Sequence, residues 1–451
     1  MTVSGYIWIL FLLLVPALSG VMYFSGHFRI ISIITSTATS LLSIVVFLLP
    51  SGIYSYFYLN SINRYILLCV ASINLFSVIY ATGYHRKLGE SRNVRLHMSM
   101  MSMFTFTMIF SLVINNLGLL WIGIEGTTAS SAILIIIEGD PADIEAAWRY
   151  VVIVSAGLSI ALVSVILVYR IFGTLEITAL LASRAYPSQI LVLAALFGII
   201  GFGTKAGIFP MHTWLPDAHG RAPSEISAIF SAVLLPIAVY AIYIIIHTIN
   251  MQIIYGASIF FILITLFFVA LVMASQRDIK RMYAYSTMEN MSLILLGFVI
   301  GNVALLGSII IILTHAFGKA GAFYSSGNII EAYGTRNLSR ITNLWTNQRF
   351  TSYTLILSTL SVSGAPPFGT FLGEFFIVSA LYSEGLGGVA IAVIILIAII
   401  FLSINYRVFG MVFSLSPIRN PTRISIQQIA ITGAAVAVSG VFTFLFLGGL
   451  L

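Results

Sequence analysis

The chain has 451 residues, of which 59% are hydrophobic and only 8% are Asp, Glu, Lys or Arg. Because a soluble domain carries about 25% of these charged residues, 21 basic and 14 acidic side chains cannot cover a water-soluble surface of this size. The composition excludes a soluble enzyme, a disordered chain and a nucleic-acid-binding protein despite a net charge of +7, and it indicates a protein that lies in lipid.

Long apolar segments follow one another along the chain. A helix needs about 20 apolar residues to cross the hydrocarbon core of a membrane, and these segments lack the alternating pattern of a membrane β-barrel. The sequence therefore predicts an all-α polytopic membrane protein with about 14 transmembrane helices. No basic segment precedes the first apolar run, so we expect a retained span there rather than a secretory signal. The predicted spans are 5–24, 28–49, 64–83, 97–115, 117–137, 146–170, 188–214, 223–248, 256–275, 281–301, 303–330, 350–383, 387–412 and 424–448.

The loops between the predicted spans differ strongly in charge. Sixteen Lys and Arg residues lie in the loops after odd-numbered spans or at their helix ends, and three lie on the other side. Because cytoplasmic loops are enriched in Lys and Arg, this asymmetry predicts that the odd loops are cytoplasmic and that both termini lie outside. The sixteen are Arg29, Arg86, Lys87, Arg92, Arg95, Arg149, Arg221, Arg277, Lys280, Arg281, Arg336, Arg340, Arg349, Arg407, Arg419 and Arg423, and the three are Arg64, Arg170 and Arg184.

Five charged residues lie well inside predicted spans. A charge at the centre of a bilayer costs about 2.5–3.5 kcal/mol on insertion scales, so such residues are candidates for function. The alternative for each is a structural role, as a neutral hydrogen-bonded group or as one partner of a fixed ion pair. The five are Glu125, Lys205, Glu289, Lys319 and Glu374.

Lys205 lies beside a predicted helix break. Pro210 follows it and removes a backbone donor, which interrupts the seventh span. A break at membrane depth is tolerated where it lines a polar, hydrated cavity. A buried lysine in such a place can alternate between its charged and neutral forms.

The region before Glu374 repeats this design. Pro366 and Pro367, together with three glycines, interrupt the twelfth span just before the carboxylate. The broken spans 7 and 12 are an odd number of spans apart, so they run in opposite directions. This pattern predicts an inverted repeat of five-helix units, spans 4–8 and spans 9–13, and transporters place ion sites at such discontinuous helices.

No linker or soluble segment interrupts the chain, so the sequence predicts one membrane domain over residues 1–451. Within it, residues 1–96 hold spans 1–3, residues 97–249 the first repeat and residues 250–413 the second repeat. Residues 414–451 hold the final span.

Further polar residues lie on the faces of spans 10 and 11. His315 and Lys319 are four residues apart and share one helix face. A histidine titrates near neutral pH, so this pair can pass a proton; the alternative is a hydrogen-bonded core histidine beside an unrelated lysine. Glu289 shares a face with Ser286 and Asn290, where a structural polar cluster and a proton relay are both open.

The residue types also restrict the chemistry. Cys69, the single cysteine, lies in an apolar run, which leaves the chain without an internal disulfide, a Cys-rich zinc site or its own iron–sulfur cluster. We expect no metal and no cofactor in this chain. The mid-membrane row of Glu125, Lys205, Lys319 with His315, and Glu374 suits protons or small cations, and it does not suit a large organic substrate.

These residues lie in motifs that resemble those of the antiporter-like subunits of respiratory complex I. The same family includes the Mrp-type cation/proton antiporter subunits and the membrane subunits of energy-converting hydrogenases. Glu125 resembles the glutamate of its span 5, and the similarity covers roughly residues 60–410. The longest motif runs from Lys205 through Pro210, His212, Trp214, Pro216, Asp217 and His219 to Ala222, Pro223 and Ser224, and the others are His315 with Lys319 and Ser363–Phe368 with Glu374.

The resemblance implies a non-catalytic, ion-translocating subunit of an oxidoreductase complex such as NADH-quinone oxidoreductase or a membrane-bound hydrogenase of a respiratory chain. In such a subunit the glutamate–lysine pair gates the central lysine, and the span-12 residue passes the proton on. The implied partners are membrane lipid, other antiporter-like and small membrane subunits, and peripheral redox subunits that carry iron–sulfur clusters and a flavin or nickel–iron centre. The implied location is a prokaryotic cell membrane or an equivalent energy-transducing membrane.

One departure concerns span 8, where the family often has a bridging lysine. Here Pro236 stands in that region, so water or His247 would have to replace the lysine, or the proline opens the helix to water. The histidine of span 10 is replaced near Glu289 and Asn290. The missing lysine and the run from Glu145 to Tyr150 favour the hydrogenase-associated branch.

Two other functions stay open at this point. One is a subunit of a non-redox, Mrp-type cation/proton antiporter, which the sequence does not separate from the redox-driven complex. The other is a stand-alone solute transporter or a membrane scaffold. The row of buried acids and bases argues against this second class, because a scaffold has no need of charges at membrane depth.

Overall fold

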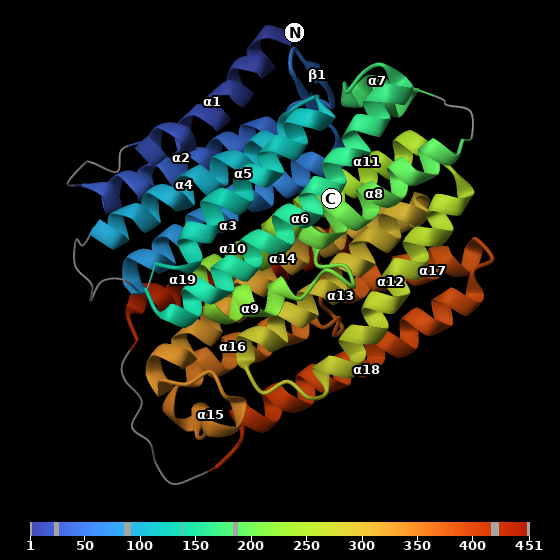
Figure 1. Ribbon diagram of the computed structural model, residues 1–451. Coiled ribbons are helices and arrows are strands. Elements are labelled where there is room, and N and C mark those ends of the chain that lie inside the picture. Colours follow the sequence, from blue (N-terminus) through green and yellow to red (C-terminus); the bar gives the residue numbers. More distant parts are fainter. Residues whose placement is uncertain are drawn as a thin grey trace. The chain divides into compact units, whose positions relative to one another are not determined.

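The computed structural model describes residues 2–21, 27–84, 92–137, 139–183, 188–415 and 424–448. Within these residues the chain is mostly helical (Figure 1). In the described part of the chain, eleven helices are long and apolar enough to cross a membrane. The predicted helical membrane architecture is confirmed, whereas the number of fourteen spans stays a prediction. Among the loop cations used for orientation, Arg86, Lys87, Arg184, Arg419 and Arg423 lie outside the described residues.

Local sequence signals begin and end several of the helices. Asn116 caps α5 (Leu117–Ile135) by accepting a hydrogen bond from the Leu119 amide at 3.0 Å. Asp278 caps α13 (Ile279–Ile300) through the amides of Lys280 and Arg281. Gly173 ends α6 (Pro141–Phe172) with a φ of 68°, a conformation that glycine adopts without steric cost. These caps fix where the polar residues of each helix lie along its length.

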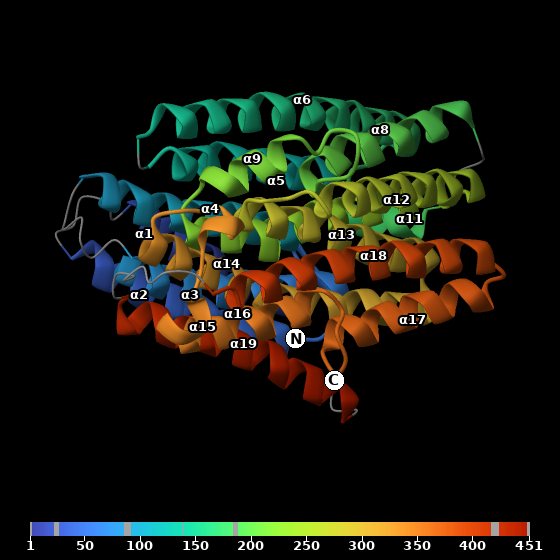
Figure 2. The ribbon, with the colours of Figure 1, turned by 90° about the horizontal axis from the view of Figure 1, so that it is seen from below.

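The chain groups into two compact units, each built from three segments. Unit 1 comprises Met1–Val78, Lys87–Trp214 and Val233–Phe261. In it α6 packs against α5 and α8, and Figures 1 and 2 show α6 and α8 side by side. Its helices and strands are α1 (Thr2–Val21), α2 (Phe28–Phe47), β1 (Gly52–Tyr54), β2 (Phe57–Leu59), α4 (Arg92–Val113), α5 (Leu117–Ile135), α6 (Pro141–Phe172), α7 (Ile177–Ala182), α8 (Gln189–Ala206) and α11 (Leu235–Ile249).

Unit 2 comprises Ile79–Arg86, Leu215–Ala232 and Ile262–Leu451. The long helix α14 is its centre and packs against α13, α16, α17 and α19. Its elements are α10 (Ser224–Ile229), α13 (Ile279–Ile300), α14 (Asn302–Tyr333), the 3₁₀ helix η4 (Leu338–Arg340), α15 (Leu344–Asn347), α16 (Arg349–Val362), α17 (Gly369–Ser383), α18 (Gly387–Val412) and α19 (Ile426–Leu447). Four further elements have residues in both units: α3 (Ser61–Tyr84), α9 (Trp214–Arg221), the π-helix η3 (Phe230–Leu234) and α12 (Gln252–Met273).

Two predicted spans are interrupted where the prolines stand. The seventh span ends as a helix at Ala206, and α9 begins only at Trp214. The twelfth span divides into α16 and α17, with residues 363–368 between them.

A short hairpin is a further difference from the prediction of helices alone. The strands β1 and β2 pair antiparallel between α2 and α3. Ser55, with a φ of 61°, turns the chain between them. The aromatic residues of this stretch favour extended backbone.

Candidate functional site

The ammonium group of Lys205 is held by hydroxyl groups of two other helices. Lys205 is fully buried in the last turn of α8. Its Nζ donates to Thr128 Oγ1 of α5 at 2.9 Å and to Tyr150 Oη of α6 at 2.6 Å. It also lies 4.9 Å from the centroid of the Tyr150 ring, within the range of a cation–π contact.

Glu125 is the acidic partner of this site. It lies one helical turn before Thr128 on α5, so both side chains share a face. Its Oε1 accepts a hydrogen bond from Ser155 of α6 at 2.6 Å, and within the described residues its Oε2 has no hydrogen-bond partner. Glu125 interacts electrostatically with Lys205, but among the described side chains the two form no direct ion pair. The site is thus a separated acid–base pair.

The interruption after Lys205 is stabilised by backbone and side-chain hydrogen bonds. Gly207 takes a φ of 78°, and the Ile208 amide donates to the Gly203 carbonyl at 2.8 Å. The indole of Trp214 donates to the Thr204 carbonyl at 2.8 Å, and its ring packs 4.8 Å from that of Tyr150. Backbone groups freed by the break therefore find partners, as burial in a membrane requires.

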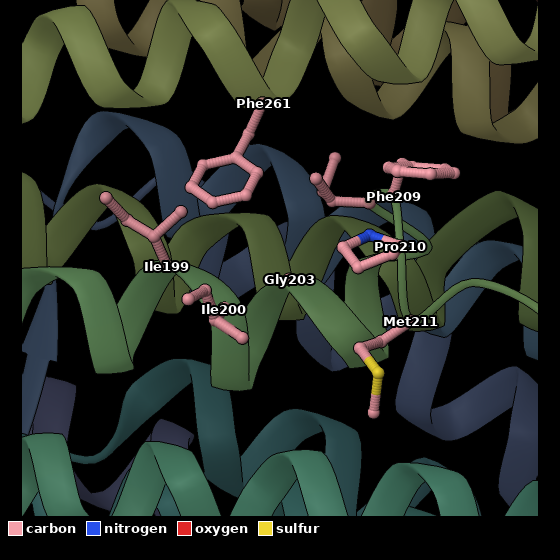
Figure 3. A pocket seen from close by; sticks show the side chains of 8 residues that line it. Ile199, Ile200, Gly203, Phe209, Pro210, Met211 and Phe261 are labelled. Atoms are coloured by element: carbon pink, nitrogen blue, oxygen red, sulfur yellow. The ribbon is translucent and has the colours of Figure 1, made fainter.

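Residues of the break also line a pocket (Figure 3). No titratable side chain lines it, so it does not belong to the polar site around Lys205. Its lining residues are Ile199, Ile200, Gly203, Ile208, Phe209, Pro210, Met211 and Phe261.

The motif residues His212, Asp217 and His219, which lie between α8 and α10, have different surroundings. His212 is buried, and its ring stacks on Phe209 at 5.6 Å. Asp217 forms an ion pair with Arg281. Burial lowers the pKa of His219 to about 3, and the positive charges of Lys319 and Lys280 act in the same direction. His219 is therefore a neutral imidazole at physiological pH.

A second cluster of polar groups lies in unit 2. Lys319, fully buried on α14, donates to the carbonyl of Tyr283 at 2.8 Å and lies 5.7 Å from the centroid of its ring. Glu289 and His315 both interact electrostatically with this ammonium. The structure therefore brings His315, Lys319 and Glu289 into one cluster. The sequence predicted only that His315 and Lys319 share a helix face, and it placed Glu289 separately with Ser286 and Asn290.

The distorted helix at Pro236 provides the partner of His315. The segment η3, just before α11, is π-helical, and proline cannot continue the ordinary backbone hydrogen bonds there. The Ser231 carbonyl of η3 lies 3.2 Å from His315 Nε2. The hydroxyl of Ser231 lies 2.5 Å from that of Thr287. Pro236 thus follows a π-helical turn, and the three sequence alternatives for this position stay predictions.

Glu374 lies against the second helix break. Its carboxylate packs so closely on Gly364 that a Cβ built there would be 2.3 Å from Oε2. Asn290 of α13 donates to the Val362 carbonyl at 3.1 Å, and Asn405 of α18 donates to the Ser363 hydroxyl at 3.0 Å. The prolines Pro366 and Pro367 therefore lie in a break whose first residues are bound from two neighbouring helices.

His247 makes its polar contact within its own helix. Its Nδ1 lies 3.0 Å from the Tyr243 carbonyl, and the two rings are 4.1 Å apart. In the described part of the chain it contacts none of the other predicted path residues.

Sequence reasoning missed the groups that hold the two lysines. Tyr150 and Tyr283 are aromatic residues in apolar helices, and no local spacing marks them as partners of an ammonium group. Lys280, counted above as a loop cation, is 3% exposed and donates to the Ala222 carbonyl at 2.8 Å. A lysine in the first turn of a helix, beside a loop, gives no sign of this burial.

Removal of the Tyr150 hydroxyl tests its role at Lys205. We expect Tyr150→Phe to lower ion transport about tenfold, because a buried ammonium that loses one acceptor is destabilised by about 1–3 kcal/mol. Tyr240→Phe is the matched control, since this buried hydroxyl accepts a hydrogen bond from Asn60 of the same unit at 2.9 Å. Equal transport in both variants would contradict the role of Tyr150.

Comparison with known proteins places this geometry in a family. Residues 114–402 match the family described as NADH:quinone oxidoreductase/Mrp antiporter, transmembrane. The chain is 30% identical over 354 residues to the hydrogenase-4 component F homolog of Methylacidiphilum infernorum. This match covers 74% of the chain and 74% of that relative. It is also 30% identical over 267 residues to NADH-quinone oxidoreductase subunit N of Desulforudis audaxviator. This match covers 56% of the chain and 52% of that relative, about half its length.

A solved structure has the same fold. A chain in the structure of the Mrp complex from Dietzia sp. superposes with a TM-score of 0.88 at 19% identity, over 100% of this chain and 95% of that one. The resemblance seen in the motifs is thereby confirmed at the level of sequence and of fold. The chain belongs to the NADH:quinone oxidoreductase/Mrp antiporter transmembrane family, and it is an antiporter-like membrane subunit.

Proposed function

We propose that the chain translocates protons, or sodium ions, as one subunit of a multisubunit, redox-driven membrane complex. The observation that carries this proposal is Lys205, a fully buried lysine held by hydroxyls beside a broken helix. A lysine in this setting can bind a proton and release it, whereas a structural lysine would be fixed in its charged form by a direct ion pair. The relatives, subunits of hydrogenase-4 and of NADH-quinone oxidoreductase, support the same reading.

The proposed mechanism is electrostatic. A change of charge at Glu125 alters the proton affinity of Lys205, which then releases its proton along the row of polar groups. Lys319 with His315 receives it, and Glu374 passes it to the outer side. In each transfer one N–H or O–H bond breaks and another forms. No step needs a metal or cofactor in this chain, so redox centres would belong to peripheral partner subunits.

The proposed membrane arrangement follows from the broken helices. Spans 4–8 and 9–13 form an inverted repeat within fourteen spans, with α8 and α16–α17 as the discontinuous members. Both termini lie on the outer side, as the loop charges predict. The two lysines then belong to opposite repeats of a single membrane domain.

A second candidate function is supported by the structural similarity to a chain of an Mrp complex. In this case the chain is a subunit of a cation/proton antiporter, and an existing ion gradient drives transport. The buried residues would act in the same order, with no electron donor involved.

Reconstitution of the complex separates the two functions. We would purify it through a tag on this chain, place it in proteoliposomes with a pH-sensitive dye, and add NADH, H₂ or reduced ferredoxin in turn. Donor-driven proton movement, with iron or flavin in the purified complex, is the expected result. Proton movement driven by a sodium gradient in a preparation without iron and flavin would reject the redox-driven function in favour of the antiporter.

A further inference from the structure

The surroundings of Lys319 in unit 2 parallel those of Lys205 in unit 1. Each ammonium lies over a tyrosine ring, with Nζ 5.7 Å from the Tyr283 centroid and 4.9 Å from the Tyr150 centroid. Each donates a hydrogen bond to a neutral oxygen. Among the residues that the structure describes, neither lysine forms a direct ion pair with a carboxylate.

The acids of the two sites are also alike. Glu289 on α13 interacts electrostatically with Lys319, as Glu125 on α5 does with Lys205. In the described part of the chain, the Oε2 atom of each carboxylate is buried and has no hydrogen-bond partner. Ser286 lies beside Glu289 without meeting hydrogen-bond geometry. An unpartnered carboxylate oxygen near a lysine is costly to bury, so its presence in both sites calls for a common explanation.

Glu289 has a second charged neighbour besides Lys319. It interacts electrostatically with Glu374, the acid at the break between α16 and α17. Glu289 is 1% exposed and Glu374 is 7% exposed, so both lie in a medium that screens charge weakly. Glu289 therefore influences the two groups between which the proton of this unit must pass.

We infer that Glu289 is the gating acid of a second switch, in which it controls the charge of Lys319 as Glu125 controls that of Lys205. The inference rests on the proposed function and assigns a role to a residue for which the sequence left a structural polar cluster and a proton relay both open. Glu289 is a positioning residue, because it acts through charge and carries no proton itself. The subunit thus holds two gated lysines, one in each unit.

The physical reason lies in the three charges. Two buried carboxylates repel one another, and a charged Lys319 offsets this repulsion. When Lys319 loses its proton, Glu289 and Glu374 are left as two uncompensated acids, and a proton on Glu374 relieves the repulsion. The charge of Glu289 therefore couples release at Lys319 to uptake at Glu374.

The first test removes this charge and keeps the shape. In the assembled complex, Glu289→Gln should lower transport about tenfold, within the range of about 5–150-fold that couplings between sites usually span. Glu289→Asp keeps the charge and should restore most of the transport. Ser292→Ala is the control, since this buried hydroxyl on the same helix bonds the Met288 carbonyl of its own helix at 2.8 Å, and the variant should transport normally.

The second test is a double-variant cycle with Lys319→Met. If Glu289 acts through Lys319, then Glu289→Gln adds no further loss once Lys319 is absent. Independent, multiplying losses would overturn the inference, as would normal transport by Glu289→Gln or an equal loss in Glu289→Asp. If Glu289→Gln fails to assemble, Glu289→Ala replaces it as the variant without the charge, and the same cycle with Lys319→Met is built on it.

Failure of this inference is distinct from failure of the proposed function. Normal transport in Glu289→Gln together with loss in Lys205→Ala would reject only the second switch. Normal transport in Lys205→Ala would reject the proposed function itself.

Discussion

Lys205→Ala should abolish ion transport while the complex still assembles. The variant removes the group that carries the charge between Glu125 and the rest of the row, and proton-transfer groups of this kind typically contribute about 10²–10⁴-fold to a rate. The fold should survive, because the hydroxyl of Tyr150 keeps a hydrogen-bond partner in Ser131, 2.7 Å away. The measurement is proton movement in proteoliposomes, with co-purification of the partner subunits as the measure of assembly.

A control for Lys205→Ala is the removal of a different cation from the same unit. Arg170 is exposed near the end of α6, so Arg170→Ala should transport at the parent rate. An assembled Lys205→Ala complex that still transports protons would show that the buried lysine is structural. This result would reject the function proposed for the chain.

Gly364→Val should block transport through the second break and destabilise unit 2. Gly364 has a φ of 75°, where a residue with a Cβ is strained by about 1–2 kcal/mol. Its Cβ would also lie 2.3 and 2.5 Å from the two carboxylate oxygens of Glu374. The side chain of Glu374 must therefore move, and transport should fall to a small fraction of the parent rate. Proteoliposome transport and the thermal unfolding temperature of the complex measure the two effects.

Gly440→Ala is the matched control for this substitution. Gly440 lies inside α19 with nothing within 4 Å of its built Cβ. In a helix interior, alanine is more favourable than glycine by about 0.5–1 kcal/mol, so stability should be unchanged or slightly higher and transport normal. A Gly364→Val complex that transported as well as Gly440→Ala would mean that the carboxylate of Glu374 is not needed at the break.

The sequence was informative about which groups lie at membrane depth. Charged residues are rare in this chain, so those that lie within apolar segments can be identified without any structure. They are Glu125, Lys205, Glu289, Lys319 and Glu374. Proline and glycine likewise predicted both helix breaks. These signals depend only on residues that are neighbours in the chain, so they can be recognised in a single sequence.

What holds the charged groups could not be predicted, because it depends on the rotation and depth of separate helices. Tyr150 meets Lys205 from a helix about fifty positions away in the chain, and no periodicity links the two. The partner of Lys280 was missed for a similar reason. Its ammonium binds the Ala222 carbonyl, just after α9, and carbonyls near a helix C-terminus readily accept hydrogen bonds from lysine. A rule that counts loop cations treats such a lysine as exposed.

The hydroxyl groups around Lys205 have one more consequence. A carboxylate partner only accepts hydrogen bonds, so it would suit the ammonium and leave the free amine poorly matched. The hydroxyls of Thr128 and Tyr150 can reverse their roles: they accept from the ammonium, and by rotating one O–H bond they donate to the lone pair of the amine. Both protonation states of Lys205 are then satisfied without movement of any helix. In the proposed transfer, the reorganisation that accompanies each proton is the rotation of one O–H bond, so the speed of this step need not depend on the slower motion of the backbone.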